Sequence, residues 1–152
     1  MSTRAIAWLN KKKIPHEVVH YAHEEKGAAF AAQATGFPLA KTIKTLVVDL
    51  GGNSFGLALM PGDRELSLRK AAKVFGVKKA AMADPAAAER LTGYHLGGIS
   101  PFGLRQRLSV VMDESLLVHD AVMINAGQRG IMLKMAPEDI LAATGGHATT
   151  LV

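Results

Sequence analysis

Two apolar runs separated by a short glycine-rich segment place the strongest constraint on how this chain can fold. Residues 43–50 and 55–60 are mostly apolar, and residues 51–54 between them read Gly-Gly-Asn-Ser. Glycine and asparagine adopt the positive φ values that tight turns between antiparallel strands require. The sequence therefore predicts a β-hairpin, and any fold assigned to the chain must contain antiparallel strands.

Short helices and further strands are predicted along the rest of the chain, most of them bounded by glycine or proline. Helices are expected at residues 3–13, 28–35, 68–75, 85–92 and 137–143. Additional strands are expected at residues 17–21, 108–112, 121–125 and 131–135. Strict alternation of strands and helices is missing, so a doubly wound sheet is the less favoured alternative. We expect an α+β fold with a mixed, mostly antiparallel, barrel-like sheet and surrounding helices.

Length and composition fit one cytoplasmic domain. The chain has 152 residues, of which 49% are hydrophobic, so residues 1–152 are expected to share one core. No apolar run approaches the ~20 residues of a membrane span, and no secretory signal pattern follows Met1. Cysteine is absent, which excludes disulfides, thiolate metal sites and a cysteine nucleophile.

The charge of the chain favours a polyanionic partner. Lysine and arginine total 18 against 13 acidic residues, which gives a net charge of +5. The basic residues that could meet an RNA backbone are Arg69, Lys70, Lys73, Lys78, Lys79, Arg105 and Arg107. Three further lysines, at residues 11–13, end a predicted helix, where lysine usually faces solvent and complements the helix dipole.

Two patterns that suggest other chemistry lack the context they need, and a third kind of motif is absent. Residues 52–56 match G-x-S-x-G, but that nucleophile motif needs a strand before it and a helix after it, whereas two predicted strands flank Ser54. His16, His20 and His23 are close in sequence, yet metal sites usually add carboxylates or cysteines at defined spacings, and no H-E-x-x-H occurs. The glycine-rich phosphate loops of nucleotide-binding proteins are absent.

Lys44 is unusual because it falls inside the first apolar run. The period of two places it on one strand face with Leu46 and Val48, and places Thr45 on the other face. An ammonium group there is costly unless it reaches water or a partner. Lys44 therefore either extends from the strand end to solvent or lines a pocket, where it could hold an anionic group or a developing oxyanion. Lys41 precedes the run and is expected to be solvated.

Two glycine-containing segments are candidate partners for Lys44. Residues 97–103 read Gly-Gly-Ile-Ser-Pro-Phe-Gly, and Arg105 and Arg107 follow them. Glycine lets backbone N–H groups approach a ligand, Ser100 adds a hydroxyl group, and arginine binds phosphate. Residues 125–130 read Asn-Ala-Gly-Gln-Arg-Gly and by themselves predict only a hairpin turn. Each segment taken alone is equally compatible with an ordinary connection.

Taken together, these segments resemble the YbaK/EbsC family of aminoacyl-tRNA deacylases, which is related to the editing insertion domain of bacterial prolyl-tRNA synthetase. The resemblance extends over nearly the whole chain. It rests on the order and spacing of Tyr-Ala-His at 21–23, Ile-Lys-Thr-Leu at 43–46, Ala-Asp-Pro at 83–85, Thr-Gly-Tyr at 92–94, Gly-Gly-Ile-Ser-Pro at 97–101 and Ala-Gly-Gln-Arg-Gly at 126–130. The Lys-Thr strand combined with the Gly-Gly-Ile-Ser-Pro loop is its most specific part.

The resemblance implies one α+β domain that hydrolyses the ester of a mischarged tRNA in trans, without a metal or dissolved cofactor. It implies Cys- or Ala-tRNA(Pro) as the substrate and prolyl-tRNA synthetase as a possible partner, and neither a membrane nor DNA is expected. The family's essential lysine falls on Lys44 and its partner threonine on Thr45. The substrate-binding positions of the family fall on Tyr21, Gly98, Ile99, Ser100 and Pro101.

Two positions depart from the family's pattern. Asn125 stands where members often have serine, and Met132 stands where they often have an acidic residue. Both are expected to line the pocket and thus to affect which aminoacyl group is accepted. A non-catalytic tRNA- or phosphate-binding module with the same pocket is the alternative function. Hydrolysis of charged tRNA distinguishes the two.

Overall fold

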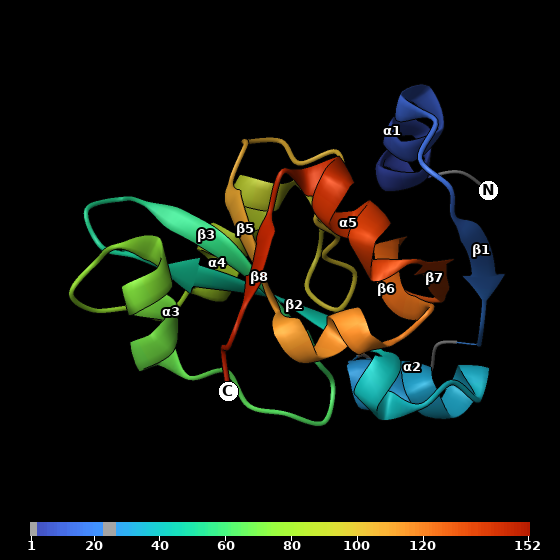
Figure 1. Cartoon of the computed structure of the whole chain (residues 1–152). Coiled ribbons are helices and arrows are strands. Elements are labelled where there is room, and N and C mark those ends of the chain that lie inside the picture. The colour runs from blue at the N-terminus through green and yellow to red at the C-terminus, as the bar shows by residue number, and fades with distance from the viewer. Residues whose placement is uncertain (1–2, 23–26) are drawn as a thin grey trace.

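Two β-sheets form the framework of the computed structural model, which describes residues 3–22 and 27–152 (Figure 1). The strands are β1 (Glu17–His20), β2 (Ile43–Asp49), β3 (Phe55–Pro61), β4 (Ala81–Met82), β5 (Ser109–Asp113), β6 (Val122–Gln128), β7 (Ile131–Met135) and β8 (His147–Thr149). The larger sheet has the strand order β4-β2-β3-β5-β8, and the smaller sheet has the order β1-β7-β6.

Five α-helices and two short 3-10 helices surround the sheets in the part of the chain that is described. The α-helices are α1 (Arg4–Lys12), α2 (Ala28–Thr35), α3 (Leu68–Phe75), α4 (Pro85–Thr92) and α5 (Pro137–Thr144). The 3-10 helices are η1 (Leu39–Lys41) and η2 (Glu114–Val118). The α+β class and the helices expected from the sequence are confirmed.

The predicted hairpin is present as β2 and β3, which pair antiparallel from Ile43 with Pro61 to Asp49 with Phe55. Both of its faces are covered. Leu57 and Leu59 of β3 belong to the main hydrophobic core, whereas Ala58 and Met60 face a second cluster under α3. Burial on both faces explains why these strands are continuous apolar runs rather than alternating ones.

Most strand pairs are antiparallel, as expected, but β3–β5 and β5–β8 are parallel. The barrel-like closure is not confirmed. The strands form two sheets, which are joined through an isolated parallel bridge between Thr42 and Met123. The strands β4 and β8 were not predicted, because two or three residues at a sheet edge carry no periodic signal of their own.

The described α-helices begin either with or without a side-chain cap. Ser67 Oγ accepts a hydrogen bond from the Lys70 N–H at 3.2 Å and caps α3. Asp84 occupies the N-cap position of α4, but its carboxylate makes no capping hydrogen bond, and Pro85 starts the helix. The fixed φ of proline is already helical, so α4 begins without a side-chain cap.

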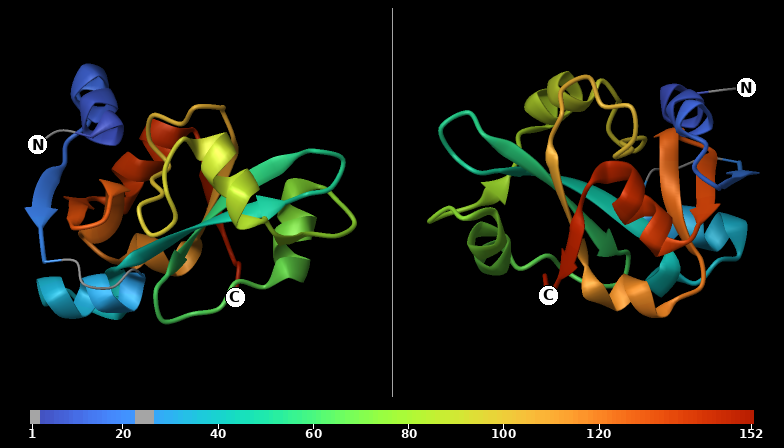
Figure 2. Two further views of the ribbon diagram at one scale, coloured as in Figure 1. Left: turned by 180° about the vertical axis from the view of Figure 1, so that it is seen from behind. Right: turned by 45° about the horizontal axis from the view of Figure 1, so that its top comes forward.

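The ends of the molecule carry different elements. Figures 1 and 2 show α3 at one end and α1, β1 and α2 at the other. β4 pairs only with Val48 and Asp49 of β2. β4 therefore does not extend along the first half of β2, where the bridge from Thr42 to Met123 brings β6 close instead, and this half leads toward the end that carries α2 (Figure 1). Within the described residues, no helix has the length and apolarity needed to cross a bilayer.

Candidate functional site

A cavity of about 180 Å³ lies where the start of β2 meets α2, β6, β7 and the loop of residues 95–103. Of the residues predicted from the sequence, it collects Lys44, Thr45, Tyr21, Ile99 and Asn125. Its other lining residues are Gly27, Ala28, Ala31, Ile43, Leu96, Gly97 and Met132. Segments separated by about half the chain thus meet around one small hollow, with the Lys44 strand on one side and the glycine-rich loop on another.

Lys44 and Thr45 both border the cavity although neighbouring strand residues point to opposite faces. The cavity lies beside the start of β2, on the side where β4 does not extend. A hollow beside a strand edge can contact residues of both faces. The face assignment itself is confirmed, since Leu46 and Val48 pack in the cluster under α3 and Val47 packs in the main core.

The Lys44 ammonium supplies the positive charge of the cavity. Lys44 is half-buried, and among residues 3–22 and 27–152 its side chain has no hydrogen-bond or ion-pair partner. A lysine kept in an apolar strand without a protein partner is available to an anionic or carbonyl oxygen of a ligand.

The Thr45 hydroxyl is the second polar group of the cavity. Thr45 Oγ1 is buried and has no hydrogen-bond partner within the described part of the chain. A buried hydroxyl without a partner costs about 1–3 kcal/mol. Such a group in a cavity wall is suited to bind a polar atom that arrives with a substrate.

Asn125 faces the cavity, but the backbone uses both ends of its amide. Nδ2 donates to the Gly97 carbonyl oxygen at 3.1 Å, and Oδ1 accepts from the Gly127 N–H at 2.8 Å and the Gln128 N–H at 3.2 Å. These bonds stabilise the irregularity in the β6–β7 pairing between Asn125 and Gln128. Asn125 therefore shapes the wall of the cavity and has little hydrogen-bonding capacity left for a ligand.

The glycine-rich loop presents only part of its predicted residues to the cavity. Gly97 and Ile99 line it, whereas Gly98, Ser100 and Pro101 are buried in the loop and are not among the lining residues. Ser100 is 0% exposed, and its Oγ accepts from the Phe102 N–H at 3.4 Å. Pro101 lines a different groove, together with Trp8 and Arg107.

Gly98 approaches protein backbone rather than open space. A Cβ atom at this position would lie 3.1 Å from the Gln128 Cα and 3.2 Å from the Arg129 nitrogen. The Arg129 side chain adds a further tie, because Nη2 donates to the Leu96 carbonyl oxygen at 3.3 Å. The loop and the β6–β7 turn are thus held together as one wall of the cavity.

The remaining lining is apolar and small. Ala28 and Ala31 of α2, Ile99 and the buried Met132 surround the space, and no Asp, Glu or His stands among the described lining residues. The alanines were predicted only as helix formers. Their spacing of three, which puts two small side chains on one helix face, was the signal that this face could border a hollow.

The basic residues predicted to contact RNA do not form one patch. Arg69, Lys70 and Lys73 lie on α3, at the end of the molecule away from α2, and Lys70 Nζ donates to the Val152 carbonyl oxygen. Arg107 lines a groove of about 750 Å³ together with Lys12 of α1. Arg105 is exposed two residues before it.

The discounted motifs are placed as expected from their context. Ser54 lies in the β2–β3 hairpin, where its carbonyl oxygen accepts a hydrogen bond from the Leu50 N–H at 2.8 Å. The strand β3, rather than a helix, follows it. His16 Nδ1 contacts the Ile14 carbonyl oxygen at 2.8 Å. His23 lies outside the described residues.

Comparison with known proteins agrees with this geometry. Residues 23–143 match the family of the aminoacyl-tRNA editing domain. EbsC of Enterococcus faecalis, a proposed Cys-tRNA(Pro)/Cys-tRNA(Cys) deacylase, is 34% identical over 95% of this chain and 90% of its own length. The multifunctional Ser/Thr-tRNA deacylase ProXp-y of Escherichia coli is 32% identical over 88% of this chain and 83% of its own.

A solved structure supports the same assignment. A proposed trans-editing enzyme for prolyl-tRNA synthetase superposes with a TM-score of 0.89 at 30% identity, covering 97% of this chain and 94% of that chain. The family match spans the β2 strand, the glycine-rich loop and the β6–β7 turn that together enclose the cavity. This chain belongs to the aminoacyl-tRNA editing domain family.

Proposed function

We propose that this chain is a trans-acting aminoacyl-tRNA deacylase, which hydrolyses the ester between a wrongly attached amino acid and the tRNA. The observation that carries the proposal is the small cavity that Lys44 and Thr45 share with Gly97 and Ile99 of the glycine-rich loop. Family membership and the deacylases among the relatives support it. We further propose that residues 1–152 act as one editing domain in the cytoplasm, where charged tRNA is used.

The size of the cavity fits an aminoacyl group rather than a whole nucleotide. Its volume of about 180 Å³ is below the ~300–1,000 Å³ of ordinary small-molecule sites. Small, uncharged amino acids such as Cys or Ala fit the apolar lining of Ala31, Ile99 and Met132. Larger aminoacyl groups are excluded by volume. We propose mischarged tRNA(Pro) as the substrate and prolyl-tRNA synthetase as the partner whose errors are corrected.

The chemistry requires positioning and charge stabilisation more than a protein nucleophile. Attack of water on the ester carbonyl forms a tetrahedral oxyanion, and its collapse breaks the acyl C–O bond while the leaving ribose oxygen takes up the proton that the water gives up. A thiol of the substrate that attacks in place of water releases the amino acid as a cyclic thioester, whereas the neighbouring ribose hydroxyl only moves the ester from one ribose oxygen to the other. With water as the attacking group, the products are the free amino acid and a tRNA with a free terminal ribose. Lys44 holds the developing oxyanion or the terminal phosphate, and Thr45 Oγ1 hydrogen-bonds a polar atom of the bound ester. Tyr21, which also lines the cavity, contacts the ribose.

The deciding experiment measures deacylation of Cys-, Ala- and Ser-charged tRNA(Pro) by the wild type and by two lysine variants. Lys44→Ala is expected to lose about 10²–10³-fold in rate and to remain folded by circular dichroism. Lys41→Ala, which changes the lysine of η1 just before β2, is the matched control and should keep the rate. Binding of tRNA without turnover of any charged form would identify a non-catalytic module instead. Loss of activity in Ser54→Ala but not in Lys44→Ala would identify an unrelated esterase.

A further inference from the structure

The carboxylate of Glu89 holds the part of the glycine-rich loop that borders the Lys44 cavity. Glu89 Oε2 accepts a hydrogen bond from the Leu96 N–H at 2.8 Å. Leu96 and its neighbour Gly97 both line the cavity, whereas no residue of α4 does. The contact therefore connects a helix outside the cavity to one of the cavity walls.

Glu89 lies at a place in α4 that electrostatics disfavours for an acidic side chain. The helix ends at Thr92, so Glu89 is in its last turn, and Gly93 follows with a φ of +81°. The carbonyl groups at the end of a helix carry a partial negative charge, which repels a carboxylate. The hydrogen bond from the Leu96 N–H, seven residues further along the chain, compensates for this placement.

His95 also contacts Glu89 Oε2, but it cannot fix the loop in the same way. Its Nδ1 lies 3.5 Å from that oxygen, and 98% of the His95 side chain is exposed. Exposed ion pairs contribute little to stability and are screened by salt. A backbone N–H that donates to a carboxylate forms a stronger, charge-assisted hydrogen bond. The Leu96 N–H is therefore the contact that positions the loop.

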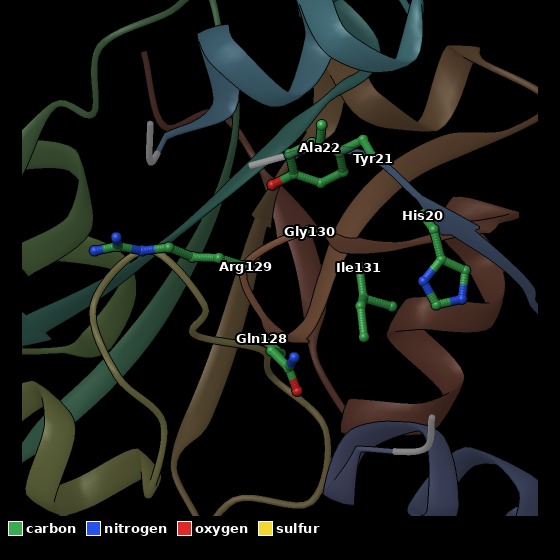
Figure 3. A pocket seen from close by; sticks show the side chains of 7 residues that line it. All are labelled: His20, Tyr21, Ala22, Gln128, Arg129, Gly130 and Ile131. Carbon is green, nitrogen blue, oxygen red and sulfur yellow. The ribbon is translucent and has the colours of Figure 1, made fainter. Parts of the chain in front are cut away.

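A second charged side chain holds the carbonyl oxygen of the same residue. Arg129 Nη2 donates to the Leu96 carbonyl oxygen at 3.3 Å. Figure 3, which views the pocket of about 470 Å³ beside the β6–β7 turn, shows the Arg129 side chain extending from that turn. A carboxylate from α4 and a guanidinium from the turn thus hold the N–H and the C=O of one loop residue. These two contacts are here named the Leu96 clamp.

We propose that Glu89 is a positioning residue, which fixes the width of the Lys44 cavity through the Leu96 clamp. The inference rests on the proposed function and names a residue that controls its selectivity for small aminoacyl groups. The cavity has a volume of only about 180 Å³. A wall displaced by about 1 Å would admit larger groups and would also misplace the ester relative to Lys44. Glu89 acts through Leu96 and does not touch the substrate.

The first measurement is the hydrogen exchange of the Leu96 N–H, followed by NMR on the full chain and independent of deacylation. Glu89→Ala removes the acceptor, so the exchange rate should rise by about tenfold. Glu89→Gln keeps an acceptor oxygen and should stay within about threefold of the wild type. Arg90→Ala changes the exposed neighbour on α4 and should leave the Leu96 exchange rate unchanged.

The second measurement compares the deacylation of Ala- and Leu-charged tRNA(Pro) by the same variants. In Glu89→Ala, kcat for the Ala-charged tRNA should fall about tenfold with KM nearly unchanged, because the contacts to the tRNA remain. The preference for Ala over Leu should narrow by about tenfold, because the larger side chain gains room. Glu89→Gln and Arg90→Ala should keep the wild-type kcat and preference. A loss of stability alone would slow both substrates equally and leave the preference unchanged.

Each outcome bears on the inference. An unchanged Leu96 exchange rate in Glu89→Ala would overturn it, and so would faster exchange without a change in the Ala-to-Leu preference. Equal losses in Glu89→Gln and Glu89→Ala would overturn it as well, since the glutamine amide oxygen can accept the same hydrogen bond. A wild type that deacylates no charged tRNA would reject the proposed function alone, and faster Leu96 exchange in Glu89→Ala would then still support the clamp.

Discussion

The side-chain amide of Asn125 connects the β6–β7 turn to the glycine-rich loop, because its Nδ2 donates to the Gly97 carbonyl oxygen at 3.1 Å. The same side chain accepts two backbone hydrogen bonds from the turn. Gly97 has a φ of +87°, a conformation that glycine adopts without strain, so the carbonyl is presented to Asn125 at low cost. The polar wall of the cavity thus depends on a contact between segments 28 residues apart.

Replacing Asn125 by alanine should lower both stability and activity. The change leaves the Gly97 carbonyl and the Gly127 N–H without their partner, which we expect to reduce the free energy of unfolding by about 2 kcal/mol. The loop would then lose its fixed position beside Lys44, and kcat/KM for deacylation should fall. Urea unfolding and the deacylation assay measure the two effects. Asn10→Ala, an exposed change on α1, should alter stability by less than about 0.5 kcal/mol. Equal behaviour of the two variants would contradict the role given to Asn125.

Replacing Thr45 by valine should separate stability from activity. Thr45 Oγ1 is buried and unpartnered in the described structure, so removing it eliminates a desolvation cost of about 1–3 kcal/mol at nearly constant volume. We expect the variant to be as stable as the wild type or more so. Deacylation should nevertheless slow by about tenfold, since a substrate hydrogen bond is lost. Thermal unfolding and kcat/KM are the measurements, and Thr45→Ser, which keeps the hydroxyl, should retain most of the rate. Full activity of Thr45→Val would show that Oγ1 does not contact substrate.

Much of the fold could be predicted from local sequence, and the parts that could not depend on contacts between distant segments. The β2–β3 hairpin follows from a pattern of a few residues. The glycines of the loop predict a close approach of its backbone to another group, and at Gly98 the side that a Cβ atom would occupy meets the backbone of Gln128 and Arg129. A glycine pattern indicates a close approach but does not say which atoms approach.

The same distinction applies to the site. Lys44 could be recognised because an ammonium group in an apolar strand needs an explanation, and the loop could be recognised by its glycines. Their meeting in one cavity required the tertiary fold. The sequence likewise could not predict that the α3 lysines lie apart from Arg107, because the pattern of charges along a chain does not say at which end of the molecule each residue lies.

The Tyr94 hydroxyl should make stability depend on pH in the alkaline range. It donates to the Phe102 carbonyl oxygen, and burial raises the pKa of Tyr94 above its ordinary value of 10.0, although the nearby Arg4 acts in the opposite direction. Because the folded state keeps this proton where the unfolded state has lost it, the contribution is complete below pH 10 and disappears as pH rises through the higher folded-state pKa.

Urea unfolding at several pH values between 8 and 11 tests this dependence. Tyr94→Phe should be about 1–2 kcal/mol less stable at pH 8, because the buried Phe102 carbonyl loses its donor. Its stability should also fall less steeply above pH 10 than that of the wild type. Tyr21→Phe, which leaves the hydrogen bond from Tyr94 to Phe102 in place, is the control and should keep the steeper loss of stability above pH 10. Parallel curves for Tyr94→Phe and the wild type would contradict the assignment.

The salt dependence of tRNA binding should show which basic residues contact the RNA. Arg105 and Arg107 follow the loop that forms the cavity wall, and Arg107 shares a groove with Lys12, whereas Arg69 and Lys73 lie on α3 at the other end. Each phosphate contact contributes about 0.7–0.9 to the slope of log K against log salt concentration. We expect the double variant Arg105→Ala with Arg107→Ala to reduce this slope by about 1.5. An RNA that spans both ends of the molecule would also give a smaller slope in the double variant Arg69→Ala with Lys73→Ala. Arg64→Ala, an exposed arginine outside both groups, is the control. A slope that both double variants leave unchanged would place the RNA on another face. A change confined to the Arg105 and Arg107 variant would restrict the RNA to the side of the loop and α1.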